Sequence, residues 1–164
     1  MDMKDLINKI TPYNLFNYLL PGVLFVVIIE ELTIYSVITD NMVLAAFICY
    51  FVGMVISRVG SLIVEAPLKK VGFLKFKDYK DFVTASKKDA RLDTLSEQNN
   101  TYRTLIAMLI MVSVTKGYEW LGTKFEFLEE WKLLIVFMLL LILFLAAYRK
   151  QTNYITQRIE KNLE

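Results

Sequence analysis

The apolar residues of this chain gather in four long runs, and the strongest run lies between Trp131 and Tyr148. Residues 133–147 include no charged residue, glycine or proline. Eighteen helical residues span about 27 Å, close to the ~30 Å thickness of bilayer hydrocarbon. A buried helix of a soluble protein usually keeps a polar stripe, and this run has none. The pattern therefore predicts a transmembrane helix over residues 131–148.

Three further apolar runs predict transmembrane helices over residues 15–35, 42–60 and 104–120. The second helix can continue past its span to Ala66, where we expect Pro67 to end it. Its last turns should then emerge from the membrane, because the whole helix is longer than the hydrocarbon requires.

Two prolines shape the first of these helices. Thr11 followed by Pro12 is typical of a helix start, with the threonine as cap and the proline at the first helical position. Pro21 and Gly22 lie inside the span, where they should bend or loosen the helix. We expect a static kink at this point, with a gating hinge as the alternative.

Lysine and arginine are unevenly distributed between the two sides of the predicted membrane. With four spans, one side carries both termini, the loop of residues 67–103 and the tail of residues 149–164. That side holds sixteen Lys and Arg residues and the other side holds three. By the positive-inside rule both termini are cytoplasmic. The predicted fold is all-α, a four-helix transmembrane bundle with cytoplasmic helical extensions, in a single domain over residues 1–164.

Small residues recur along one face of the second predicted helix. Gly53, Ser57 and Ser61 follow at intervals of four, with Gly60 beside them. Small residues at this spacing let two helices approach closely in lipid. We interpret this face as a helix-packing or oligomer contact.

Arg58 and Glu65 lie seven residues apart on the same helix and should therefore share a face. An unpaired charge near the membrane boundary is costly. We expect Arg58 to pair with Glu65, with another chain's carboxylate or with a lipid phosphate. A plain anchor whose charged end reaches the interface is the alternative.

The third span is the least apolar, because it includes Ser113, Thr115 and Lys116. A weakly apolar membrane helix usually faces protein or water. These three residues are therefore candidates for a pore lining or a subunit interface, against plain packing within the bundle.

The segments predicted to be cytoplasmic have their own helical patterns. In the loop, residues 78–90 have the spacing of a short amphipathic helix, placed under the bundle or on the membrane surface. A further helix is expected to start at Asp93 or Thr94 and to run unbroken through Tyr118. The helix of the fourth span should continue into the tail of residues 149–164, which should dock on the loop or on another subunit.

The composition excludes several kinds of chemistry. The chain has no histidine and one cysteine, Cys49, which removes the commonest general base, makes zinc binding improbable and rules out an internal disulfide. Asp78 and Asp81 could hold Mg²⁺, although a solvated helix face is the expected reading. No phosphate-cradling glycine loop is present. We expect no enzyme and no cofactor, and the net charge of +2 disfavours nucleic acid as a partner.

The tail opens with a short motif of its own. Arg149 is followed, after four residues, by the ring of Tyr154. This pattern resembles the Arg-x4-His motif of HEPN-type proteins, and its place after a membrane helix resembles the pore-forming membrane accessory of type VI-B CRISPR systems. The resemblance implies a homo-oligomeric pore of the bacterial inner membrane that slows the growth of phage-infected cells. It covers six residues, and since tyrosine replaces the histidine, RNA cleavage is not implied.

Two functional hypotheses follow from the sequence. The first is a homo-oligomeric pore or channel-like effector in phage defence or the stress response. The second is a non-conducting membrane scaffold that recruits a soluble cytoplasmic protein through the loop and the tail. The expected partners are thus membrane lipid, further copies of the chain and, in the second case, a soluble protein. An enzyme acting on lipid is a weaker third option.

Overall fold

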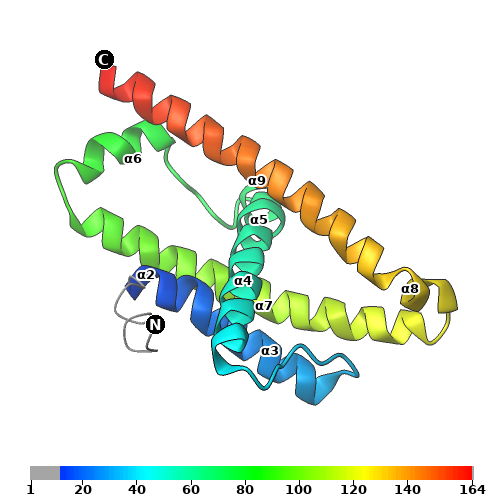
Figure 1. Cartoon of the computed structure of the whole chain (residues 1–164). Helices are drawn as coiled ribbons and strands as arrows, with labels where there is room; N and C mark the ends of the chain where they lie inside the picture. The colour runs from blue at the N-terminus through cyan, green and yellow to red at the C-terminus, as the bar shows by residue number, and fades with distance from the viewer. Residues whose placement is uncertain (1–11, 164) are drawn as a thin grey trace.

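The computed structural model describes residues 12–163, and the regular structure within them is helical, with no strand (Figure 1). Four stretches, Leu15–Leu32, Met42–Lys70, Arg91–Gly122 and Lys132–Leu163, are long and apolar enough to cross a membrane. The predicted all-helical class and four spans are therefore confirmed. In chain order the elements are α2 (Pro12–Asn14), the π-helical segment η1 (Leu15–Leu19), α3 (Leu20–Leu32), α4 (Met42–Val59), the π-helical segment η2 (Gly60–Val64), α5 (Glu65–Lys70), α6 (Tyr79–Ser86), α7 (Arg91–Gly122), α8 (Glu126–Glu130) and α9 (Lys132–Leu163).

The end of the first span and the start of α7 differ from the predicted boundaries for local reasons. The first span ends at Leu32, because Thr33 takes an extended backbone conformation and its hydroxyl donates to the Ile29 carbonyl at 2.8 Å. α7 begins at Arg91, whose N–H donates to the Asp89 carboxylate at 2.9 Å. The predicted cap Thr11 lies outside the described residues.

Each of the two π-helical segments precedes a proline in the same span. A proline clashes with the carbonyl four residues earlier and offers that carbonyl no N–H. For Pro21 and Pro67 these carbonyls belong to Asn17 and Ile63, which lie in η1 and η2. The wider π turn accommodates the mismatch, so the chain passes both prolines without leaving the helix. The second helix therefore continues to Lys70 instead of ending before Pro67.

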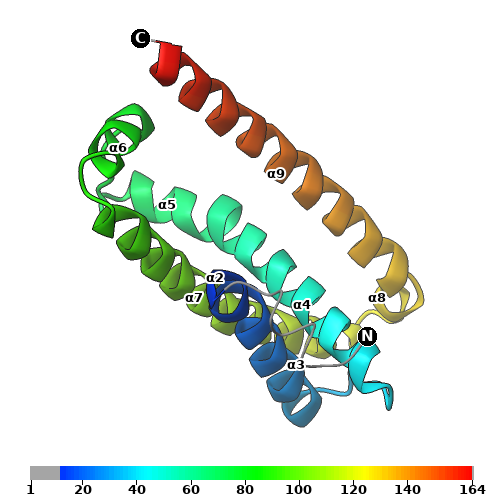
Figure 2. The same cartoon turned by 60° about the vertical axis from the view of Figure 1, so that its left-hand side comes forward.

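α3, α4 and α7 pack against one another and form the core of the molecule (Figure 2). The crossing of the first two helices is backbone on backbone. A Cβ added at Gly22 would lie 1.8 Å from the Cys49 carbonyl oxygen, and one added at Gly53 would lie 1.7 Å from the Tyr18 carbonyl oxygen. Only a hydrogen atom fits at either position. The apolar core around this crossing consists of Phe25, Val26, Ile29, Ile56, Val64, Ala107, Met108 and Val112.

α9 is one unbroken helix that is much less covered than the other three. In its membrane-crossing window 6% of the residues are buried, against 33% for Leu15–Leu32. Leu143 is the buried residue of this helix, and the neighbouring Phe144 ring lies 6.1 Å from the ring of Phe51 on α4. Since lipid is as apolar as the helix itself, such a helix can cross a membrane with few protein contacts.

Polar contacts tie the helices together at the end that carries residues 33–41 and 123–131, which we call the loop end. Lys116 Nζ donates to the Leu32 carbonyl at 2.6 Å and also contacts the Glu119 carboxylate at 2.6 Å. The Tyr35 hydroxyl donates to Glu129 at 2.5 Å, and Lys132 Nζ lies 3.1 Å from the same carboxylate. These contacts connect the start of α9 to the loop that follows α3.

Candidate functional site

A cavity of about 1060 Å³ lies at the opposite end of the helices, which we call the cation-rich end. Its walls come from α4, η2, α5, α6, α7 and α9, and from the loop between α5 and α6. Figure 1 shows α6 beside the tail of α9 at this end, with α5 nearby. Eight charged residues line the cavity, the five cations Arg58, Lys69, Lys75, Lys77 and Arg103 and the three acids Glu65, Asp78 and Asp81.

The Glu65 carboxylate is the centre of the charge cluster at the inner wall of the cavity. The residue is 6% exposed, and its oxygens lie 2.8 Å from Arg103 Nη1 and 2.7 Å from Lys69 Nζ. Lys150 Nζ approaches to 3.9 Å and donates to the carbonyl and hydroxyl oxygens of Ser61 at 2.8 and 2.7 Å. A buried carboxylate is costly unless it is paired, and here three cations share one. The cluster therefore keeps an excess of positive charge.

Arg58 does not pair with Glu65, and the expectation from the sequence needs correction. Arg58 Nη2 donates to the Tyr18 hydroxyl at 3.3 Å, and no ion pair involves Arg58 in the part of the chain that the structure describes. Seven residues make about two turns of a regular α-helix, but the π turn of η2 between the two residues accommodates an extra one. Glu65 is therefore turned toward α7, on the side of Ser57, while Arg58 faces η1.

A buried polar network lies one layer deeper than the charge cluster. Asn17 and Thr104 are fully buried and Ser57 is 3% exposed. The Thr104 hydroxyl lies 2.9 Å from Asn17 Oδ1 and 2.8 Å from the Asn100 carbonyl, both acceptors for its proton. Asn17 Nδ2 donates to the Tyr13 hydroxyl at 3.1 Å and lies 3.3 Å from Ser57 Oγ. Buried polar groups are thus satisfied within the network, which joins η1, α4 and α7.

Most of this arrangement is not predicted from the sequence. Ser57, Ser61 and Glu65 are predicted site residues, but Arg103, Lys150 and Thr104 are not. A usable signal was present in Asn17, because an amide inside an apolar span must find a partner or lie at the surface. The partners themselves depend on how three helices cross, and this does not follow from the period of one helix.

The tail of α9 docks on α6. The ring centroids of Tyr154 and Tyr79 are 4.9 Å apart, and Lys87 Nζ donates to the Asn162 side chain at 2.7 Å. The Lys80–Glu160 ion pair, at 3.2 Å, adds a further contact. The predicted docking of the tail on the loop is therefore found within one chain. Tyr154 packs in this contact and lines the cavity, whereas its motif partner Arg149 is exposed and does not line it.

The small-residue face of the second helix is occupied within the chain. Gly53 contacts the Tyr18 backbone, and a Cβ at Gly60 would lie 3.2 Å from the Cβ of Ala107. Ser57 belongs to the polar network and Ser61 accepts from Lys150. These residues hold the helices of one copy together, and an oligomer contact through them stays a prediction.

The weakly polar residues of the third span have local roles in the structure. The hydroxyls of Ser113 and Thr115 donate to carbonyls of their own helix, at 3.1 and 2.9 Å. Lys116 caps the end of α3. No described contact places these three residues around a passage through a single copy, so a pore lining formed by several copies stays a prediction.

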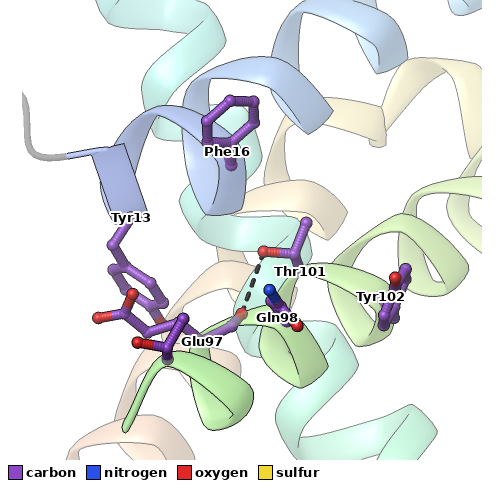
Figure 3. A pocket seen from close by; sticks show the side chains of 7 residues that line it. Tyr13, Phe16, Glu97, Gln98, Thr101 and Tyr102 are labelled. Carbon is purple, nitrogen blue, oxygen red and sulfur yellow. Dashed lines mark hydrogen bonds between the residues drawn. The ribbon is translucent and has the colours of Figure 1, made fainter. Parts of the chain in front are cut away.

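A second, smaller hollow of about 360 Å³ lies between the start of the first helix and the N-terminal part of α7 (Figure 3). Tyr13 and Phe16 form one wall, and Glu97, Thr101 and Tyr102 are on the other. Burial and the neighbouring Tyr18 raise the pKa of the Tyr13 hydroxyl. Glu97 is the single charged residue among those that line the hollow, so this site has no cluster of charges.

The chemistry of the larger cavity favours anions. Asp78 and Asp81 line it, but no group of three or more His, Cys, Asp or Glu side chains that could hold a metal occurs among residues 12–163. Arginine and lysine donors outnumber the carboxylates that could accept from them. The charged groups that line the cavity are therefore better suited to a negatively charged group than to a cation.

No family model, no curated protein and no solved structure matches this chain, so its function has to be inferred from its own geometry.

Proposed function

We propose that this protein is a membrane scaffold that holds a soluble partner at its cation-rich end, on the cytoplasmic side of a bacterial inner membrane. The platform at this end carries the proposal. It is made of α6, which lies outside the four spans, and of the N-terminal turns of α7 and the tail of α9, which extend beyond the apolar parts of their spans. Tyr79 and Tyr154 hold the platform together in one chain. A fixed platform beside a charged cavity is suited to binding another molecule.

The packing of the core supports a non-conducting role for a single copy. The polar network ends at Thr104, and the next layers are filled by apolar side chains such as Ile29, Ile56 and Met108. A conducting path needs polar groups or water along its length. Beyond Thr104, apolar side chains fill the centre of the three-helix core in the part of the chain that the structure describes.

Removal of the distal tail tests the scaffold proposal. A chain ending at Gln151 keeps Lys150 and the whole apolar run of α9 but loses Tyr154. We expect it to insert into the membrane as before and to lose the soluble protein that copurifies with the full chain after crosslinking. Leu139→Ala, on a 61% exposed position of α9, is the control that should keep the partner. An unchanged set of crosslinked soluble proteins in the truncated chain would contradict the proposal.

A second candidate is a homo-oligomeric pore that acts in phage defence or the stress response. The exposed apolar length of α9 favours it, because such a surface is available for lateral contact with another copy. The expected result is an oligomer in detergent by native mass spectrometry and ion leakage from liposomes that contain the protein. A strictly monomeric protein that never makes liposomes leak would exclude this candidate.

A further inference from the structure

The inner wall of the cavity holds more positive charge than the chain itself neutralises. Lys69, Arg103 and Lys150 gather around Glu65, the single carboxylate within 4 Å of them among residues 12–163, and Arg58 lines the same cavity. The side chains of Arg103 and Lys150 are only 18% and 28% exposed, so water screens them less than it screens surface lysines. Partly buried cations in excess of acids require a further anion.

Two hydrogen-bond donors at the inner wall have no anionic acceptor in the described part of the chain. Arg58 donates to a neutral phenol, Tyr18, although its guanidinium prefers anionic acceptors. Arg103 Nε is buried and has no hydrogen-bond partner within the described part of the chain. An unsatisfied buried donor is destabilising and usually marks a missing partner. Both arginines line the same cavity.

Asp78 and Asp81 do not supply this partner. They line the cavity, but both are exposed, and neither forms an ion pair among residues 12–163. Lys75 and Lys77, which line the cavity beside them, are exposed cations that balance their charge. The excess at the inner wall therefore remains.

We propose that the cavity binds a phosphate group, with Arg58 and Arg103, which line it, as its charged ligands. A phosphate monoester carries up to two negative charges and three terminal oxygens, which matches several converging donors better than one carboxylate does. Arginine binds phosphate through two parallel N–H groups. The group belongs either to a phospholipid head or to a small phosphorylated molecule in water, since the cluster lies where an apolar span gives way to polar helices.

Two binding measurements on the full-length, delipidated protein in detergent distinguish the two sources. The first compares phosphatidic acid with phosphatidylcholine by native mass spectrometry. The second measures the Tm in inorganic phosphate and in sodium chloride of equal ionic strength. Retention of phosphatidic acid over phosphatidylcholine identifies a lipid head, whereas a rise in Tm with phosphate and no lipid preference identifies a soluble phosphate compound. Absence of both effects overturns the proposal.

Paired variants locate the binding to the cavity. Arg58→Gln should weaken the response to phosphate or phosphatidic acid by at least about tenfold, because a charge-assisted hydrogen bond is lost. Arg149→Gln removes the same charge from an exposed position next to Lys150 and should leave the response unchanged. Arg58→Lys keeps the charge and should retain part of the binding, which guards against a mere folding defect. Equal binding by Arg58→Gln and Arg149→Gln overturns the proposal.

Discussion

The stretch Leu15–Leu32 and α9 are both apolar enough to cross a membrane, yet 33% of the residues are buried in the first and 6% in the apolar window of the second. The difference lies in their small residues. Gly22 of the first helix lies against the backbone of α4, and Gly53 of α4 lies against the backbone of Tyr18, so the two helices are in direct backbone contact. The apolar run of α9 has no glycine over residues 133–147, and its side chains are large from residue 133 to residue 145. Hydropathy thus predicts which segments enter the membrane, and residue size decides which of them pack.

The largest expected effect comes from filling the helix crossing. Gly53→Leu places a side chain where a Cβ alone would lie 1.7 Å from the Tyr18 carbonyl oxygen. Because backbone must move, we expect a loss of about 3 kcal/mol or more in the free energy of unfolding. Ala146→Leu makes the same class of change on the exposed part of α9 and should have almost no effect. Equal thermal unfolding of the two variants in detergent would contradict the packing described for the core.

The next largest effect is expected from the ion pairs of Glu65, which connect the core helices to α9. Glu65→Gln leaves Arg103, Lys69 and Lys150 without their carboxylate, and we expect a loss of about 2 kcal/mol. Glu160→Gln removes an acid from an exposed pair with Lys80 and should cost about 0–1 kcal/mol. Denaturant unfolding of both variants measures the difference. If the two substitutions cost the same, Glu65 does not organise the cluster.

A smaller and more local effect is expected in the tail. Tyr154→Ala removes the ring contact with Tyr79, so the tail should lose its dock on α6 while the membrane span of α9 persists. Hydrogen exchange should then accelerate in residues 152–163 and stay unchanged in α3 and α4. Ile155→Ala changes the exposed neighbour and provides the control. Faster exchange throughout the chain would show that α9 is coupled to the core more tightly than its burial indicates.

The smallest effect concerns the contacts of Glu129 with Tyr35 and Lys132, which connect the start of α9 to the loop after α3. Hydrogen bonds from Tyr35 and Lys132 lower the pKa of Glu129 from its ordinary value of 4.5. A carboxyl with a lowered pKa in the folded state stabilises the fold above pH 4.5, and this contribution is lost as the pH falls through the lowered value. Burial and the bond to Glu129 also raise the pKa of Tyr35, which keeps the phenol protonated as the donor.

The substitution Tyr35→Phe removes the hydrogen bond between Tyr35 and Glu129. Without the hydroxyl, the pKa of Glu129 should rise toward 4.5 in a carboxylate NMR titration, and the acid-induced loss of stability should begin at a higher pH. Thr39→Val, on the same loop, is the control that should leave the titration unchanged. A Glu129 titration that is identical in the Tyr35→Phe protein would show that this hydrogen bond does not form in solution.

The sequence was sufficient for the features that depend on one helix at a time. The four spans, the long continuous α7 and the continuation of α9 into a docked tail all follow from hydrophobic period and length. Two predictions were wrong because they assume a regular α-helix throughout the second span. Pro67 was expected to end a helix that passes it, and Glu65 was expected to meet Arg58, because the π turns were not foreseen.

The contacts between helices were not predictable from the sequence for a different reason. Asn17 meets Thr104, and Lys150 meets Ser61, each across separate helices, and these contacts depend on crossing angles that no spacing records. The face with Gly53 was recognised as a contact surface, but its partner lies in the same chain. A stripe of small residues shows that something packs closely and does not say which chain supplies it.

The π-helical segment η2 has a consequence for insertions and deletions in this helix. Its extra residue changes the helix phase, which brings Ser57 and Glu65 to the side of α7 although they are eight residues apart. Loss of one residue from Gly60–Val64 would leave seven, about two turns of an ordinary α-helix, and so would keep both side chains on that side. The same loss one turn earlier or later would rotate one of the two polar layers away from its partners. Loss of a residue within η2 would, however, restore the clash at Pro67 that the wider turn accommodates, so the helix phase and the passage of the proline depend on the same turn.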